Sequence, residues 1–175
     1  MVPSSLALSG LVLVALMPFA SAQAQNGDPD SVTVMEHVTP VVRWSHGRST
    51  ETYDAILFSS GPSGPVVFSY GMGIRLIDLS KVPDSALRYS GGVGVHLDIG
   101  YRVGQSPVVA RAGATGWMLP FPVVFIGGGD VRAELALLPR GAGPTLAVGV
   151  FAARYAPEGF KNDDAGITVS VGYQL

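Results

Sequence analysis

The chain has 175 residues, 14% of them charged, and a formal net charge of −2. This length corresponds to a single domain, and the scattered charges form no basic surface, which argues against nucleic acid as a partner. Because the chain contains no cysteine, disulfide scaffolds, thiolate metal sites and cysteine nucleophiles are excluded.

The amino-terminal segment has the pattern of an export signal. Residues 6–19 form a nearly continuous apolar run, interrupted by Pro18 and shorter than the roughly 20 residues that a spanning helix needs. Small residues follow at the spacing that signal peptidases cleave, after Ala22 or Ala24. Residues 1–5 lack the usual Lys or Arg, and an amino-terminal anchor helix is the alternative. We predict a signal peptide over residues 1–22 and one domain over residues 23–175.

From Val66 onward, apolar residues recur at every second position, which is the period of a β-strand. Val66, Phe68 and Tyr70 alternate with small or polar residues such as Ser69 and Gly71. The many glycines, 23 in the chain, also disfavour long helices. Six strands are predicted on this pattern, over residues 66–76, 93–103, 108–115, 131–137, 146–150 and 167–175.

Two earlier segments, 32–44 and 52–59, supply a predicted first and second strand. Their alternation is poorer, and Glu36 and Pro40 interrupt the first. The predicted connections alternate in length along the chain. Those at 60–65, 104–107 and 139–144 are short, whereas those at 79–90, 118–129 and 155–165 are longer. A short connection at 46–51 departs from this alternation. Short periplasmic turns and longer outer loops are typical of outer-membrane barrels.

The composition of the two strand faces predicts which face is buried. The polar faces carry mostly Gly, Ser and Thr with a few charges, which suits the narrow interior of a small barrel. The apolar faces of the six clearest strands carry no charge, as contact with lipid requires. In lipid only a closed barrel satisfies the backbone of a sheet. We therefore predict an all-β fold, an antiparallel up-and-down transmembrane β-barrel of about eight strands.

Residues 166–175 alternate apolar and small or polar side chains up to the end of the sequence. With Val169, Val171, Tyr173 and Leu175 on one face, this segment resembles the terminal strand of bacterial outer-membrane barrels, which usually ends in an aromatic residue rather than leucine. Together with the leader, the chain resembles the small eight-stranded group that includes opacity-type surface proteins. The resemblance implies a Gram-negative outer membrane, with membrane lipid and the barrel-assembly machinery as partners.

Within the predicted barrel, the charged and histidine side chains of the polar faces are expected to form an interior network of ion pairs, because an unpaired buried charge is strongly unfavourable. These residues are Arg75, His96, Asp98, Arg102, Arg111, Arg132 and Glu134. Five aromatic residues are predicted to lie at the level of the lipid headgroups, Trp44, Tyr70, Tyr101, Trp117 and Tyr173. The outer loops are where a surface partner would bind.

No cofactor or metal site is predicted, because the three histidines are far apart and lack ligand spacing. The preferred function is a structural or surface-interaction role without catalysis. A soluble periplasmic ligand-binding barrel, with the apolar faces lining a cavity, is the first alternative. A lipid-modifying barrel enzyme using His96 and Asp98 is the second. Lipid A deacylases place a serine two residues after the histidine, whereas Thr39, Arg48 and Asp98 stand there in this chain.

Overall fold

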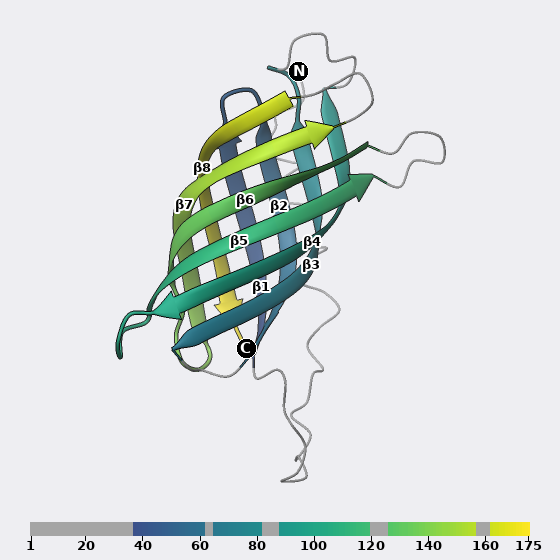
Figure 1. Cartoon of the computed structure of the whole chain (residues 1–175). Helices are drawn as coiled ribbons and strands as arrows, with labels where there is room; N and C mark the ends of the chain where they lie inside the picture. Colours follow the sequence, from purple (N-terminus) through teal and green to yellow (C-terminus); the bar gives the residue numbers. More distant parts are fainter. Residues whose placement is uncertain (1–36, 62–64, 82–87, 120–125, 157–161) are drawn as a thin grey trace.

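The computed structural model describes residues 37–61, 65–81, 88–119, 126–156 and 162–175, and the predicted signal peptide lies outside them. Eight antiparallel strands form a closed barrel in which β1 also pairs with β8 (Figure 1). This confirms the predicted all-β, eight-stranded antiparallel barrel. The strands are β1 (His37–Gly47), β2 (Glu51–Ser60), β3 (Val66–Asp78), β4 (Tyr89–Arg102), β5 (Val108–Leu119), β6 (Ile126–Leu137), β7 (Gly143–Ala156) and β8 (Asn162–Gln174).

The two ends of the barrel differ in their connections. At the end where β1 begins and β8 finishes, here called the turn end, strands are joined by residues 61–65, 103–107 and 138–142. At the opposite end, the loop end, they are joined by residues 48–50, 79–88, 120–125 and 157–161. Gly104, at the β4–β5 turn, has a φ of 57°, a left-handed conformation that favours glycine.

The loop-end connections are shorter than the sequence predicts, because the strands continue further. The segment 118–129 was expected to be a loop, but Met118 pairs with Gly127 and Trp117 with Gly128 in the β5–β6 ladder. Three consecutive glycines have weak strand propensity, yet here they extend β6 beyond the region where alternation is visible. Residues 120–125, which hold most of the apolar run predicted there, lie outside the described residues.

The predicted first two strands are present as β1 and β2, and their poor alternation has a structural reason. Val41, Ile56 and Phe58 point inward and form a buried apolar cluster, so apolar residues occupy both faces of these strands. Pro40 is in register with Leu57 of β2 but lies one residue beyond the ladder with β8, which runs from Val41 to Gly47. Its missing N–H therefore falls where that ladder ends, a position that tolerates proline.

The seam that closes the barrel depends on close backbone approach. Gly166 of β8 is in register with Gly47 of β1. A Cβ atom on Gly166 would overlap the carbonyl oxygen of His46, and one on Gly47 would overlap the carboxylate of Asp164. Glycine at both positions lets β1 and β8 come together at the loop end of the seam.

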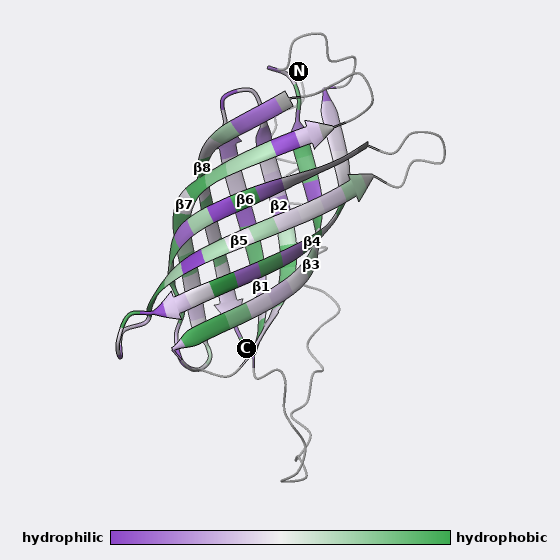
Figure 2. Ribbon diagram, in the orientation of Figure 1, coloured by the Kyte–Doolittle hydropathy of each residue, from purple (hydrophilic) through white to green (hydrophobic). Residues whose placement is uncertain are grey.

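Hydrophobic and hydrophilic residues alternate along the strands, as Figure 2 shows. The inward residues are buried, whereas large apolar side chains on the outer surface are 38–62% exposed, from Tyr70 to Met72 and Tyr101. Inside, two apolar layers lie at different levels. Ile77, Trp117, Phe151, Ala153 and Tyr155 form the loop-end layer, and Val67, Val109, Ala136 and Ala147 form the turn-end layer.

Candidate functional site in the barrel interior

A layer of charged side chains occupies the interior of the barrel. Strand alternation turns them inward from six strands, β1 to β6, and their side chains are at most 9% exposed. The layer contains four cations and four anions, so its formal charge is zero. Its members are Arg43, Asp54, Arg75, Asp98, Arg111, Asp130, Arg132 and Glu134.

Arg75 links two strands that do not pair with each other. Its Nε and Nη2 atoms donate to both carboxylate oxygens of Asp54 on β2, at 2.6 and 2.8 Å. Its Nη1 atom lies 2.7 Å from Asp130 Oδ2 on β6. A bidentate arginine–carboxylate pair is among the strongest polar contacts in proteins. Arg75 therefore links β2 and β3 to β6 across the barrel interior.

Arg132 of β6 likewise joins several strands, through contacts with β4 and β5. Its Nη2 atom donates to Asp98 Oδ1 at 2.7 Å, and its Nη1 atom donates to Asp130 and to the hydroxyl of Thr115. Arg111 donates through Nε and Nη2 to Glu134 Oε2 at 2.9 and 2.6 Å. Asp130 is thus shared between Arg75 and Arg132, which joins the pairs into one network.

Arg43 is held differently from the other arginines. It is fully buried, but no described residue accepts a hydrogen bond from its guanidinium. The nearest carboxylate contacts are Glu134 at 3.7 Å and Asp54 at 4.0 Å, and the ring of Phe58 lies 5.8 Å from the guanidinium carbon. Arg43 is therefore retained by electrostatic attraction and a cation–π contact rather than by hydrogen bonds.

His96 is buried in this layer, but it does not pair with Asp98. Its Nδ1 atom lies 2.9 Å from the hydroxyl of Thr115, and its ring meets Phe58 edge to face. No serine hydroxyl contacts His96 among the described residues. The Thr115 hydroxyl and the Phe58 ring thus hold the His96 imidazole inside the barrel.

The loop-end layer corrects one prediction. Trp117 was predicted to lie at the lipid headgroup level, but its side chain points inward, is 5% exposed and packs against Tyr155 with ring centroids 5.8 Å apart. It shares the inward parity of Arg111 and Thr115 on β5. The other predicted interface aromatics, Trp44, Tyr70, Tyr101 and Tyr173, stand at outward positions of their strands.

A second polar cluster fixes the β1–β2 turn. Asp164 of β8 is buried and accepts hydrogen bonds from the backbone N–H groups of Arg48 and Thr50, at 2.7 and 2.9 Å. The Thr50 hydroxyl also donates to Asp164, at 2.6 Å, and contacts the Tyr155 hydroxyl at 3.2 Å. This carboxylate therefore orders the loop end of the seam between β1 and β8.

All seven residues predicted for the interior network do point inward, at buried or nearly buried positions. Six of them contribute to the central layer or its margin, whereas Arg102 lies apart at the turn end. Sequence reasoning missed Arg43, Asp54 and Asp130. The first two stand on the strands with blurred alternation, and Asp130 would have been found by extending the Arg132 and Glu134 alternation back by two residues.

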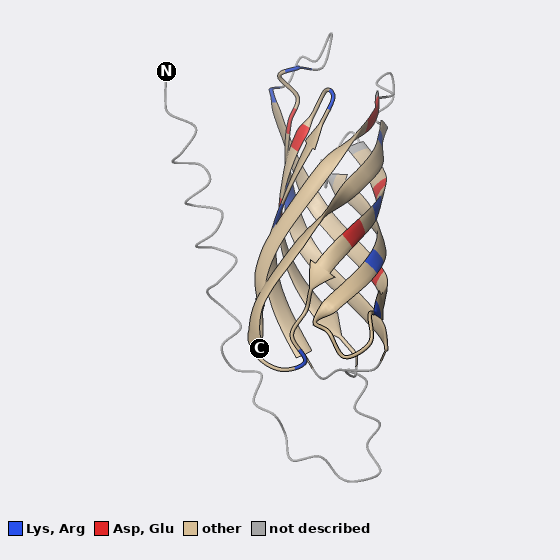
Figure 3. Cartoon of the chain, turned by 90° about the vertical axis from the view of Figure 1, so that its left-hand side faces the viewer, with Lys and Arg blue, Asp and Glu red and all other residues tan. Residues whose placement is uncertain are grey.

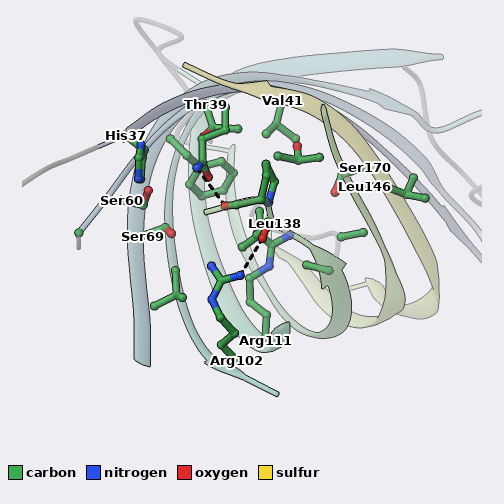
Figure 4. Close-up of a pocket in the computed structure, with 18 residues that line it drawn as sticks. His37, Thr39, Val41, Ser60, Ser69, Arg102, Arg111, Leu138, Leu146 and Ser170 are labelled. Atoms are coloured by element: carbon green, nitrogen blue, oxygen red, sulfur yellow. Dashed lines mark hydrogen bonds between the residues drawn. The ribbon is translucent and has the colours of Figure 1, made fainter. Parts of the chain in front are cut away.

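The charged layer and the two apolar layers together fill the interior with side chains. An eight-stranded barrel is just wide enough for its interior side chains to meet. At the turn end a cavity of about 30 Å³ remains, lined by residues of several strands (Figure 4). The ion pairs of the central layer connect strands on opposite sides of the barrel.

Among the described residues, no group of three His, Cys, Asp or Glu side chains is placed to hold a metal ion. Within the same residues, no helix has the length and apolar character needed to cross a membrane. Comparison of the chain with protein-family models, with curated proteins and with solved structures finds no match.

Proposed function

We propose that this chain is an outer-membrane β-barrel protein with a structural or surface-interaction role, closed to solutes and without catalytic activity. The observation that carries the proposal is the inverted arrangement of the barrel. Its charged side chains are buried inside, whereas its large apolar side chains face outward. This is the arrangement that a bilayer requires of a barrel.

The outer surface supports contact with lipid in three ways. Its exposed apolar residues form a band around β3–β8, far more than the scattered patches that soluble monomers expose. The outward-facing charges Asp78, Arg154 and Asp163 lie near the loop end of their strands. The strands are 10–14 residues long, and about 9–11 residues span a bilayer at the usual tilt.

The alternative of a soluble ligand-binding barrel needs the apolar strand faces to line an interior cavity. Their outward exposure and the charged interior argue against it. The enzyme alternative needs His96 beside an acid and a serine, and the contact of His96 with Thr115 argues against that arrangement. The predicted leader and the resemblance of β8 to a terminal barrel strand favour the outer membrane of a Gram-negative cell over other membranes.

Fractionation tests the location. The full chain is expressed in a Gram-negative host, membranes are separated by density after a urea wash, and boiled and unboiled samples are compared on a gel. We expect recovery with the outer membrane and a mobility shift on boiling, because a closed barrel stays folded in cold detergent. Recovery in the soluble periplasm would contradict the proposed outer-membrane location.

Orientation can be tested cleanly, because the native chain has no cysteine. Lys81 lies at the loop end with a side chain 53% exposed, and Arg140 lies exposed at the turn end. On intact cells, a membrane-impermeant maleimide should label Lys81→Cys but not Arg140→Cys. Both variants should be labelled after the outer membrane is opened. The reverse pattern on intact cells would contradict an outward-facing loop end.

A further inference from the structure

The turn end of the barrel interior contains a buried arginine without an acidic partner. Arg102, the last residue of β4, is 4% exposed. Its Nη1 atom donates to the carbonyl oxygen of Leu138 at 2.8 Å, and its Nε atom has no hydrogen-bond partner among the described residues. No described carboxylate forms an ion pair with it, and the charge that acts on it is another cation, Arg140.

A cavity lies against this arginine. Figure 4 shows the guanidinium groups of Arg102 and Arg111 side by side, facing the space bounded by Thr39 and Ser69. Arg111 is already paired with Glu134, so the uncompensated charge is that of Arg102. The remaining polar lining comes from imidazole, hydroxyl and amide side chains, those of His37, Thr39, Ser60, Ser69, Thr145, Ser170 and Gln174.

No aspartate or glutamate side chain lines this cavity in the part of the chain that the structure describes. Aspartate and glutamate are absent from the lining and from the described parts of the turn-end connections. Figure 3 shows acidic residues in the middle and at the loop end of the barrel but none at the turn end, beside the C-terminus. A buried charge without a counter-charge is strongly unfavourable, so this position favours an anion.

We propose that the turn-end cavity binds a small monovalent anion, of the size of chloride, held by the guanidinium group of Arg102 and by hydroxyl groups of the lining. The cavity of about 30 Å³ has room for at least one water molecule, which needs roughly 10–15 Å³. That space suits a halide or another small monovalent anion. The half-buried residues Ser60, Gly61 and Leu138 at its edge leave a way in from the turn end.

The site is independent of whether the barrel lies in a membrane. Binding to the folded state raises stability with ligand concentration. The purified full chain in detergent is therefore unfolded in urea at constant ionic strength while sodium chloride replaces sodium gluconate, a much larger organic anion. Across a chloride range from one tenth of the dissociation constant to ten times it, we expect the unfolding equilibrium constant to fall about tenfold.

Two variants identify the site. Arg102→Gln should abolish the difference between chloride and gluconate, whereas Arg140→Gln, which removes an exposed cation at the same end, should keep it. Equal chloride dependence in Arg102→Gln and the native chain would overturn the proposal. If Arg102→Gln does not fold, a bromide-soaked crystal of the native chain decides the question. An anomalous peak beside Arg102 supports the site, and its absence overturns it.

Discussion

Arg132 provides the most direct test of the charged interior. Replacing it by methionine keeps much of the side-chain volume but removes the donor to Asp98, Asp130 and Thr115. The charged layer then holds three cations against four carboxylates, all nearly inaccessible to water. Asp98 retains only Arg111, at 3.5 Å, and Asp130 retains Arg75, at 2.7 Å.

The expected cost follows from that unpaired charge. Breaking a buried pair by removing one partner costs about 3–5 kcal/mol of the free energy of unfolding. Adding Asp98→Asn to Arg132→Met restores neutrality, with three cations and three carboxylates. The double variant should therefore lose less stability than the sum of the two single variants, by about 1 kcal/mol or more.

Urea unfolding of the barrel in detergent micelles, followed by tryptophan fluorescence and by gel mobility without boiling, measures both quantities. Arg154→Met is the matched control, because its pair with Asp163 is exposed at the loop end and should contribute nothing measurable. A loss below about 1 kcal/mol for Arg132→Met, or strict additivity in the double variant, would refute the account of a closed, dry ionic layer.

Three further substitutions, one of them with a matched control, test the outer surface, the seam between β1 and β8, and the β1–β2 turn. Leu97 stands at an exposed outward position of β4. If that position lies near the middle of the bilayer, Leu97→Arg should lower the free energy of unfolding in liposomes by about 2–4 kcal/mol. In a soluble barrel the same substitution would be nearly neutral, so unfolding measured in liposomes distinguishes the two. Gly166→Ala should prevent seam closure or cost about 1–3 kcal/mol, whereas Gly116→Ala, where a Cβ atom meets nothing within 4 Å, should be neutral or slightly stabilising by urea unfolding. Asp164→Ala removes the acceptor of two backbone N–H groups and a hydroxyl, so the free energy of unfolding should fall by about 2–4 kcal/mol, and unchanged stability would show that the β1–β2 turn holds without it.

The two-residue period of the sequence predicts on which side of the sheet a residue stands. Most residues of the barrel interior could be predicted from this period alone. It placed His96 and Arg102 inside correctly because side-chain direction depends only on position along the strand. It did not predict that His96 pairs with Thr115 rather than Asp98. Such pairing depends on the stagger between β4, β5 and β6, and the sequence of one strand does not encode that stagger.

For Trp117, the two-residue strand period predicted the correct side-chain direction, whereas the preference of aromatic rings for the membrane interface predicted the wrong one. Its odd-numbered position already placed it on the face of Arg111 and Thr115, yet ring chemistry favoured a place at the membrane interface. The structure follows the period, and the Trp117 side chain packs in the loop-end layer with Ile77 and Tyr155. In a narrow barrel, strand parity is therefore better evidence for the direction of an aromatic side chain than residue type.

Charged residues in the middle of the barrel differ in role from Arg102 at its turn end, and the sequence alone does not distinguish the two groups. In the middle, four arginines and four carboxylates balance in formal charge, so the layer as a whole carries no net charge that would favour an ionic ligand. At the turn end Arg102 lacks this balance and faces a cavity. Recognition by this protein should therefore be sought at the two ends of the barrel, in the loop-end connections and in the cavity beside Arg102, rather than through its centre.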